Sequence, residues 1–316
     1  MHPMKALLLL AAGAVLSVAA GAIWPTPWPL KVSIAVIVVT LVIAAYASDA
    51  PAKSWRAIEK LRRRARWLPP RVGVLCDLDS DPNNPETFAW TIRSPSQWVD
   101  EIKKLAVAIG TKIHVKQIEA SSSFEPYSAV LNPYGGVYPE LEPDALGTLN
   151  KIADYVNRGG LFVNVADIPC YWSHNPRINR KIDATPFMGF DEAGRPIRPF
   201  WKSPIVEKLG LWIRKPNADD SNCTVDVELA DKFAHIDDDL ARVRVDRMVV
   251  CERNVEPIFR PIRVGDLSFT TFFFAGYGKG RFLISLLFMG ATHPENKGMP
   301  RLIGKVLLDA VSKYRS

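Results

Sequence analysis

The sequence predicts an α/β protein in which a membrane anchor of two helices precedes a domain with a mostly parallel β-sheet. Two uncharged apolar runs near the N-terminus predict the anchor. Apolar strands alternate with amphipathic helices over residues 71–167, and this order predicts a parallel sheet covered by helices. A YGKG turn between two apolar strands predicts a β-hairpin near the C-terminus.

The N-terminal apolar runs cover residues 6–24 and 32–47. Each approaches the roughly 20 residues that a helix needs to cross a bilayer. The PTPWPLK segment between them is short and rich in proline, so residues 1–50 are expected to form a transmembrane helical hairpin. A cleaved signal peptide is the alternative for the first run, although a second apolar run follows it at once.

A basic segment, residues 51–70, follows the second apolar run. Under the positive-inside rule it stays in the cytoplasm, which predicts a two-pass inner (plasma) membrane protein with both termini cytoplasmic. Its helical spacing also predicts a lipid-bilayer partner, with anionic headgroups bound by basic side chains; the alternative is a topology signal and spacer. These side chains are Lys53, Arg56, Lys60, Arg62, Arg63, Arg64 and Arg66.

The net charge of +7 is confined to the N-terminal part of the chain. Residues 1–70 hold nine Lys or Arg and two acidic residues, and the remainder holds 31 of each sign. No nucleic-acid partner is therefore expected for the main domain. The four cysteines contain no CxxC pair, which argues against a zinc site or a disulfide framework. We expect no metal and no cofactor.

Residues 71–316 are expected to form one cytosolic α/β domain. The predicted N-terminal helix of this domain begins after Ser94, a favoured N-cap residue, and ends at Gly110. Apolar spacing predicts strands at residues 71–79, 111–118, 128–133 and 161–167, and helices at 94–110, 143–160 and 299–314.

Two segments resemble the class I glutamine amidotransferase-like superfamily, which has a flavodoxin-like fold. They are AVLNPYGGVYPELEPDALGTLNKIADYVNRGGLFVNV (129–165) and GYGKGRFLISLLFMGATHPEN (276–296). The resemblance implies that His293 is a general base oriented by Glu295. It also implies that Gly135 and Gly136 supply oxyanion N–H groups, and it places the nucleophile after strand 161–167, where Cys170 stands.

The sequence around Cys170 departs from that pattern. A nucleophile elbow is a strained turn that needs small neighbours, but Pro169 precedes the cysteine and Tyr171 and Trp172 follow it. The usual elbow is therefore expected to be absent, and Cys170 is interpreted as a buried thiol. This argues against enzyme activity.

A second candidate site is the acidic turn DLDSDPNN. Asp77 and Asp79 follow the first strand and could hold Mg²⁺ in a phosphoesterase; the alternative is an acidic turn with local side-chain capping. Ligands of α/β folds bind at the carboxyl ends of strands. The predicted ligand-binding residues are Asp77, Asp79, Tyr134, Gly135, Gly136 and His293, with Cys170 beside them.

Three functions remain open from the sequence. The first is a noncatalytic sensor or effector at the inner membrane that binds a small ligand or a protein partner, and that could form a homo-oligomer. The second is a membrane-tethered hydrolase or amidotransferase that uses Cys170, His293 and Glu295. The third and weakest is a Mg²⁺-dependent phosphoesterase built on Asp77 and Asp79.

Overall fold

The chain divides into two compact units, residues 1–66 and 67–316, and every residue described below lies in the second. The computed structural model describes residues 69–78, 93–141, 147–175, 180–183, 189–190, 196–197, 203–214, 223–236, 240–245, 247–287 and 296–313.

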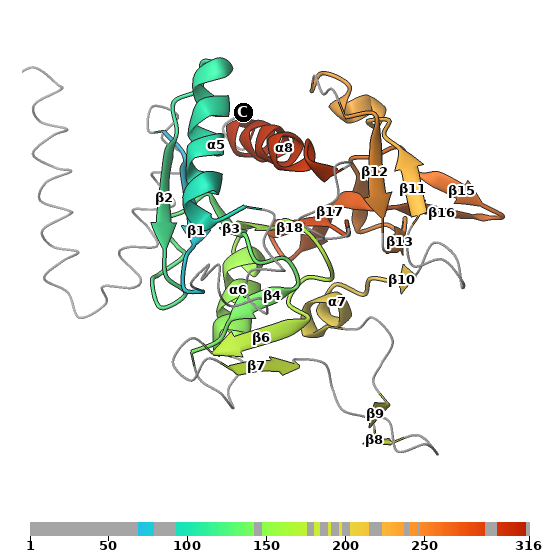
Figure 1. Cartoon of the computed structure of the whole chain (residues 1–316), viewed down its shortest axis with the longest axis horizontal. Helices are drawn as coiled ribbons and strands as arrows, with labels where there is room; N and C mark the ends of the chain where they lie inside the picture. The colour runs from blue at the N-terminus through green and yellow to red at the C-terminus, as the bar shows by residue number, and fades with distance from the viewer. Residues whose placement is uncertain are drawn as a thin grey trace, which may run out of the picture. The chain divides into compact units, whose positions relative to one another are not determined.

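A seven-stranded sheet with the order β14-β17-β18-β5-β3-β1-β2 forms the centre of the described part (Figure 1). The five strands from β18 to β2 are parallel, whereas β17 and β14 run antiparallel to their neighbours. The strands are β1 (Arg71–Leu75), β2 (His114–Ile118), β3 (Ala129–Asn132), β5 (Leu161–Asn164), β14 (Val255–Pro257), β17 (Phe272–Tyr277) and β18 (Gly280–Ser285).

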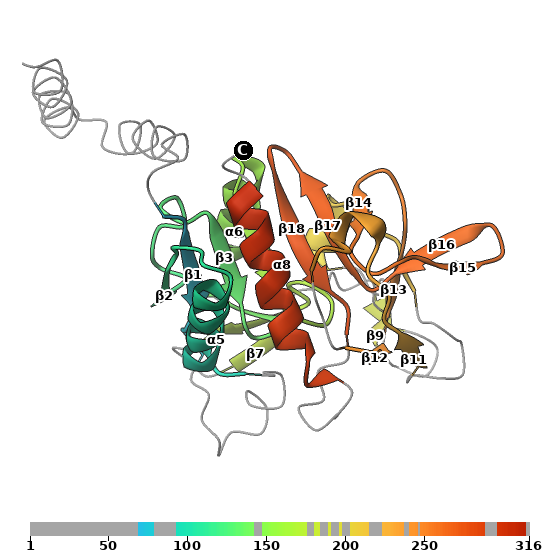
Figure 2. The ribbon, with the colours of Figure 1, turned by 90° about the horizontal axis from the view of Figure 1, so that it is seen from above.

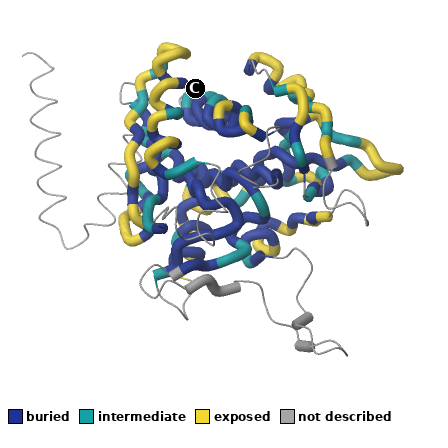
Figure 3. The backbone as a smooth tube through the Cα atoms, viewed as in Figure 1, coloured by how far each residue is buried: buried dark blue, intermediate teal, exposed yellow. Residues whose placement is uncertain are grey.

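Helices cover both faces of this sheet. Alternate residues of a strand point to opposite faces, so Leu161 and Val163 pack with α5 (Pro95–Ala108) and α8 (Met299–Lys313). Phe162 points the other way and packs with α6 (Gly147–Asn157). Figure 2 shows α8 and α5 lying over the strands, and Figure 3 shows the sheet buried between the layers.

The ends of the helices follow from local sequence. At the start of α5, the Ser94 side chain accepts from the Gln97 backbone N–H while the Gln97 side chain accepts from the Ser94 N–H, a complete capping box. At the start of α6, both carboxylate oxygens of the buried Glu140 accept from the Thr148 N–H, at 3.2 and 3.0 Å. An internal carboxylate therefore already occupies the positive end of α6.

Beyond residue 136 many short strands pair locally in four smaller sheets. These sheets are β4-β6-β7, β8-β9, β11-β12 and β10-β13-β16-β15. Their strands, with the helical elements among them, are β4 (Val137–Pro139), β6 (Trp172–Asn175), β7 (Arg180–Asp183), β8 (Gly189–Phe190), β9 (Pro196–Ile197), α7 (Pro204–Lys208), β10 (Ile213–Arg214), β11 (Cys223–Asp226), η1 (Asp231–Phe233), β12 (Arg242–Val245), β13 (Met248–Val250), β15 (Ile262–Val264) and β16 (Leu267–Thr270).

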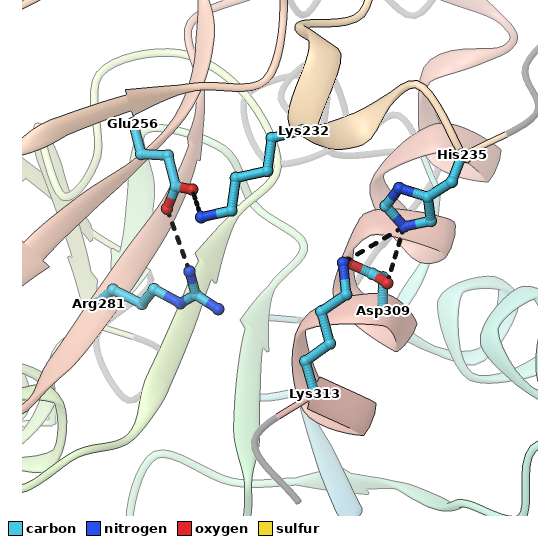
Figure 4. A network of polar contacts seen from close by, with 6 residues as sticks. All are labelled: Lys232, His235, Glu256, Arg281, Asp309 and Lys313. Carbon is cyan, nitrogen blue, oxygen red and sulfur yellow. Dashed lines mark hydrogen bonds and ion pairs between the residues drawn. The ribbon is translucent and has the colours of Figure 1, made fainter. Parts of the chain in front are cut away.

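Two carboxylates, each between two basic side chains, fasten the η1 segment to the sheet and to α8 (Figure 4). At α8, Asp309 lies 3.0 Å from the His235 ring nitrogen Nε2 and 2.9 Å from Lys313 Nζ. The two groups are Lys232–Glu256–Arg281 and His235–Asp309–Lys313.

We expect Asp309→Asn to lower the free energy of unfolding by no more than about 1 kcal/mol, because its two basic partners are about half exposed to solvent. Urea denaturation measures the change. The effect should shrink further in 1 M NaCl, which screens exposed charges. A loss of several kcal/mol would contradict the assignment of this group as a surface ion-pair network.

The predicted membrane anchor is not supported. The predicted spans, residues 6–24 and 32–47, and nearly all of the basic segment lie outside the described residues. In the described part of the chain, no helix is long and apolar enough to cross a bilayer. The longest described helix, α8, has 15 residues and rises about 22 Å, short of the roughly 30 Å hydrocarbon core. The two-pass inner-membrane prediction is therefore corrected.

The predicted fold class is corrected with it. In place of a membrane hairpin followed by one α/β sheet, the described residues contain four α-helices and eighteen strands in five sheets. The physical reason is that many of the short segments after residue 170 pair with sequence neighbours. The pairs β6-β7, β8-β9 and β15-β16 are all antiparallel and need no crossover helix.

Candidate ligand-binding site at the carboxyl edge of the sheet

The carboxyl ends of β1, β3, β5 and β18 lie at one edge of the main sheet because these strands are parallel neighbours. Asn132 at the end of β3 pairs with Asn164 at the end of β5, which in turn pairs with Ile284 of β18. The loops that leave these strands therefore meet at this edge. It is the edge at which open α/β sheets bind ligands.

Two buried asparagines organise the loops. Asn132 Nδ2 donates to the carbonyl oxygens of Gly135 and Val137, at 3.0 and 2.8 Å, and lies 3.3 Å from Asn164 Oδ1. Asn164 Nδ2 donates to the carbonyl oxygens of Ala166 and Asp167, at 2.6 and 3.2 Å. Both side chains are fully buried. The two amides thus tie the backbone of both loops to the ends of β3 and β5, and the hydrogen bonds compensate for the burial of the two polar side chains.

The loop after β3 carries three predicted ligand-binding residues. The Tyr134 hydroxyl donates to the Leu75 carbonyl and accepts from the Leu78 N–H, which fixes the end of β1. Gly135 has φ +62°, a conformation that favours glycine. A Cβ on Gly136 would stand 2.8 Å from the Asp167 carboxylate, so position 136 requires glycine for this approach. Tyr134 is itself 2% exposed and fills the space beneath the loop.

Asp77 follows β1 at the same edge. Both of its carboxylate oxygens lie 2.8 Å from the Ala120 backbone nitrogen, and Lys151 Nζ donates to the Ala120 carbonyl. Burial raises the pKa of Asp77, and the Ala120 N–H and Lys151 oppose this. Burial lowers the pKa of Lys151, which Asp77 partly restores. Asp77 and Lys151 thus attract each other electrostatically, and burial removes part of the water from around both groups.

A pH dependence of stability follows from Asp77. Its folded pKa lies above the ordinary value of 3.8, so the folded state binds the proton more tightly than the unfolded state. We expect the contribution of Asp77 to the free energy of unfolding to fall as the pH rises from about 3.8 through the folded pKa. Urea titrations of the wild type and Asp77→Asn across this window measure it. A difference between the two proteins that does not change with pH would contradict the expectation.

Asp167 and Arg247 form a second charged couple, which the sequence did not identify. Asp167 Oδ1 accepts from the Ile168 N–H at 2.7 Å and lies 3.3 Å from Arg247 Nη1. The Asp167 backbone is left-handed, with φ +57°, and its N–H donates to the Leu287 carbonyl. The side chains of the pair are only 15% and 16% exposed. The pair links the main sheet to the segment that leads into β13.

Cys170 is fully buried in the same loop. Burial raises the pKa of its thiol strongly, so the group is protonated at neutral pH. The preceding Pro169 carbonyl accepts from the Ser203 hydroxyl, at 2.5 Å, and the rings of Tyr171 and Trp172 pack edge to face after it. A catalytic cysteine requires the opposite change in pKa, because its reactive form is the thiolate.

The backbone at Cys170 differs from the expectation. The bulky neighbours predicted no strained turn, yet Cys170 has φ +55°, which is rare for a residue other than glycine. The turn is nevertheless unlike a nucleophile elbow, which leads from a strand into a helix. Here the chain continues from Cys170 into strand β6, which pairs in parallel with β4.

The structure thus brings Tyr134, Gly135, Gly136 and Cys170 to one edge, with Asp77 at the end of the neighbouring strand. Asp79, His293 and Glu295 lie outside the described residues. Among the described residues, no group of three or more His, Cys, Asp or Glu side chains could hold a metal ion. Five residues of the edge were missed by the sequence reasoning: Asn132, Lys151, Asn164, Asp167 and Arg247. The one signal was an asparagine in each of the two apolar segments that form β3 and β5.

No family model matches this sequence, and no curated protein matches it. Solved structures with similar parts include the β-galactosidase from Bacillus circulans sp. alkalophilus, at 10% identity and a TM-score of 0.40 over 76% of this chain. The exo-β-1,4-mannosidase Op5Man5 from Opitutaceae bacterium strain TAV5 has 12% identity and a TM-score of 0.38 over 85%. PurLQS from Thermotoga maritima has 14% identity and a TM-score of 0.36 over 79% of this chain and 100% of its own.

This chain spans 31% of the β-galactosidase and 38% of the mannosidase. At these TM-scores the likenesses assign neither a fold family nor an activity. They also do not support membership of the glutamine amidotransferase-like superfamily, which is corrected. The physical reason for the misleading resemblance is turn chemistry: Gly135 and Gly278 both have positive φ, as tight turns of many folds require.

Proposed function

We infer that the carboxyl edge of β1, β3 and β5 is a noncatalytic binding site for a small ligand or a protein partner. The observation that carries this inference is the state of Cys170. Its thiol is fully buried and protonated, although its backbone is held in a strained conformation. Strain of this kind persists where surrounding structure enforces it, and it clusters at functional sites.

Polar chemistry at the same edge supports binding. Asp77 and Lys151 have pKa values shifted toward their neutral forms by burial, and such groups mark candidate functional sites. Both are tied to residue 120, so their positions are fixed before a ligand arrives. A preorganised charged couple reduces the entropy that binding must overcome.

Hydrolase assays of the full-length chain test the noncatalytic part of the proposal. L-Glutamine and p-nitrophenyl acetate serve as substrates, with release of ammonia and p-nitrophenolate as readouts. Cys170→Ser is the matched control because it keeps a side chain of similar size at the same backbone position. The proposal predicts no difference between the two proteins. Turnover that Cys170→Ser abolishes would overturn it in favour of the thiol hydrolase.

A parallel assay addresses the phosphoesterase alternative. p-Nitrophenyl phosphate is incubated with the wild type and with Asp77→Asn in millimolar MgCl₂. Because the described contacts of the Asp77 carboxylate are with the protein itself, we expect no Mg²⁺-dependent hydrolysis. Hydrolysis that requires both Mg²⁺ and Asp77 would contradict a noncatalytic edge.

A further inference from the structure

Arg247 and Asp167 resemble a carboxylate-binding site in which the bound carboxylate is a side chain of the protein itself. Guanidinium groups bind carboxylates most strongly through paired contacts of about 2.7–2.9 Å. Here the contact between Arg247 Nη1 and Asp167 Oδ1 is longer, at 3.3 Å. The same oxygen accepts from the Ile168 N–H at 2.7 Å. The Oδ1 atom of Asp167 therefore accepts a hydrogen bond from its own loop and also contacts the Arg247 guanidinium.

Backbone conformation shows how the loop holds this carboxylate in place. Asp167 at φ +57° and Cys170 at φ +55° are the two residues other than glycine with positive φ in the described part of the chain. Both lie in one loop and are separated by two residues. Left-handed backbone costs free energy at such residues, so release of the Asp167 side chain would permit a relaxed loop conformation.

Arg247 is a charged donor that the protein holds largely out of water. The guanidinium is 16% exposed and always charged, and a charge removed from water to this extent must be paired. Next to the couple, the missing side chain of Gly136 lets the Asp167 carboxylate approach the loop, because a Cβ at this position would stand only 2.8 Å from Asp167 Oδ2. A carboxylate from another molecule would meet the same donor in the place of the Asp167 carboxylate, once that side chain had moved away.

We propose that Arg247 is the anchor of a binding site for ligands that carry a carboxylate, and that Asp167 fills this site until a ligand carboxylate displaces it. The proposal rests on the noncatalytic binding function inferred above and names the class of ligand. Displacement releases the Ile168 N–H from Asp167 Oδ1 and frees the loop that holds Cys170.

The first experiment removes the internal occupant. Asp167→Gly is the suitable variant because glycine adopts φ +57° without strain. Acetate is the probe, since it reproduces the CH₂–COO⁻ group that the substitution deletes. We expect acetate to raise the Tm of Asp167→Gly in a saturable manner. Neutral acetamide should have no such effect, and neither should acetate on Asp167→Gly combined with Arg247→Gln.

The second experiment uses the wild type. Hydrogen exchange of the Ile168 amide reports on its bond to Asp167 Oδ1. We expect acetate to accelerate this exchange while amides in the core of the sheet stay protected. Sodium chloride at equal ionic strength is the control for screening, and inorganic phosphate shows whether the site distinguishes a carboxylate from another oxyanion.

Two outcomes overturn the proposal. Acetate that stabilises Asp167→Gly no more than it stabilises the double variant would show that Arg247 does not bind it. Rescue of the variant without any change at Ile168 in the wild type would make Asp167 a permanent structural partner. If Asp167→Gly does not fold, the exchange of the Ile168 amide in the wild type decides alone, and an exchange rate unchanged by acetate overturns the proposal. These outcomes are independent of Cys170 chemistry, so failure here is distinguishable from failure of the noncatalytic assignment.

Discussion

Asn132→Asp is expected to lower the free energy of unfolding by about 3–5 kcal/mol at neutral pH, the usual cost of an unpaired buried charge. The substitution preserves the shape of the side chain but replaces the Nδ2 donor with an oxygen. That oxygen would face the carbonyls of Gly135 and Val137 and the Asn164 side-chain oxygen, all of which now lie within 3.3 Å of Nδ2.

The pH dependence of this variant gives a second signature. Burial among acceptors would raise the pKa of the new carboxyl above its unfolded value, so stability is lost as pH rises through that pKa and regained in acid. Urea denaturation between pH 4 and 8 measures it. Asn157→Asp, at an exposed position of α6, adds the same charge and should cost less than about 1 kcal/mol. Equal losses in both variants would contradict the role assigned to Asn132.

Gly280→Ala is expected to destabilise the domain by about 3 kcal/mol. Its Cβ would stand 2.3 Å from the carbonyl oxygens of Gly160 and Val156, and backbone atoms cannot move aside as a flexible side chain can. The clash would separate the β17–β18 hairpin from the end of α6, which packs beside it.

Gly276→Ala is the matched control within the same hairpin. No atom lies within 4 Å of its added Cβ, and alanine reduces the entropy of the unfolded chain. We expect its stability to equal or slightly exceed that of the wild type in thermal and urea denaturation. A loss of stability as large as that of Gly280→Ala would contradict this account, because it would show that the clash with the Gly160 and Val156 carbonyls is not the cause of the destabilisation.

Elements with a strong local pattern were predictable from the sequence. The helix expected at 94–110 is confirmed as α5, and the helix expected at 299–314 is confirmed as α8. Apolar spacing indicated both helices, and the Ser94 cap also indicated the start of α5. The strands expected at 71–79 and 161–167 are confirmed in shorter form as β1 and β5. Each ends earlier than predicted because its last residues enter the loops of the carboxyl edge.

The short strands after residue 170 could not be assigned from the sequence. Strands such as β8, β9 and β10 have two residues each, too few to show a periodic pattern. Their existence depends on neighbours across the sheet. The membrane anchor predicted from the two apolar runs, the proline-rich segment between them and the basic flank lies outside the described residues, and no described helix supports it.

The sequence predicted those residues of the candidate site that lie together in one short segment of the chain. Tyr134, Gly135 and Gly136 stood out as a loop after a strand, and their place at the carboxyl edge follows from the parallel pairing. The Asp167–Arg247 couple joins residues 80 positions apart, so no local pattern announces it. The bulky neighbours of Cys170 did not indicate its positive φ, and the hydrogen bond from Ser203 to the Pro169 carbonyl joins residues too far apart in the sequence to be predicted.

Alkylation of Cys170 in the folded full-length chain tests the noncatalytic assignment most directly. Iodoacetamide is added at pH 7.5, and peptide mass spectrometry follows each cysteine with time. The half-buried Cys251 is the internal comparison, with a pKa raised by burial to about 11. Because the Cys170 thiol is fully buried and protonated, we predict that it reacts more slowly than Cys251 and is labelled only after the protein is unfolded in urea. Labelling of Cys170 in the folded protein as fast as or faster than Cys251 would contradict the account.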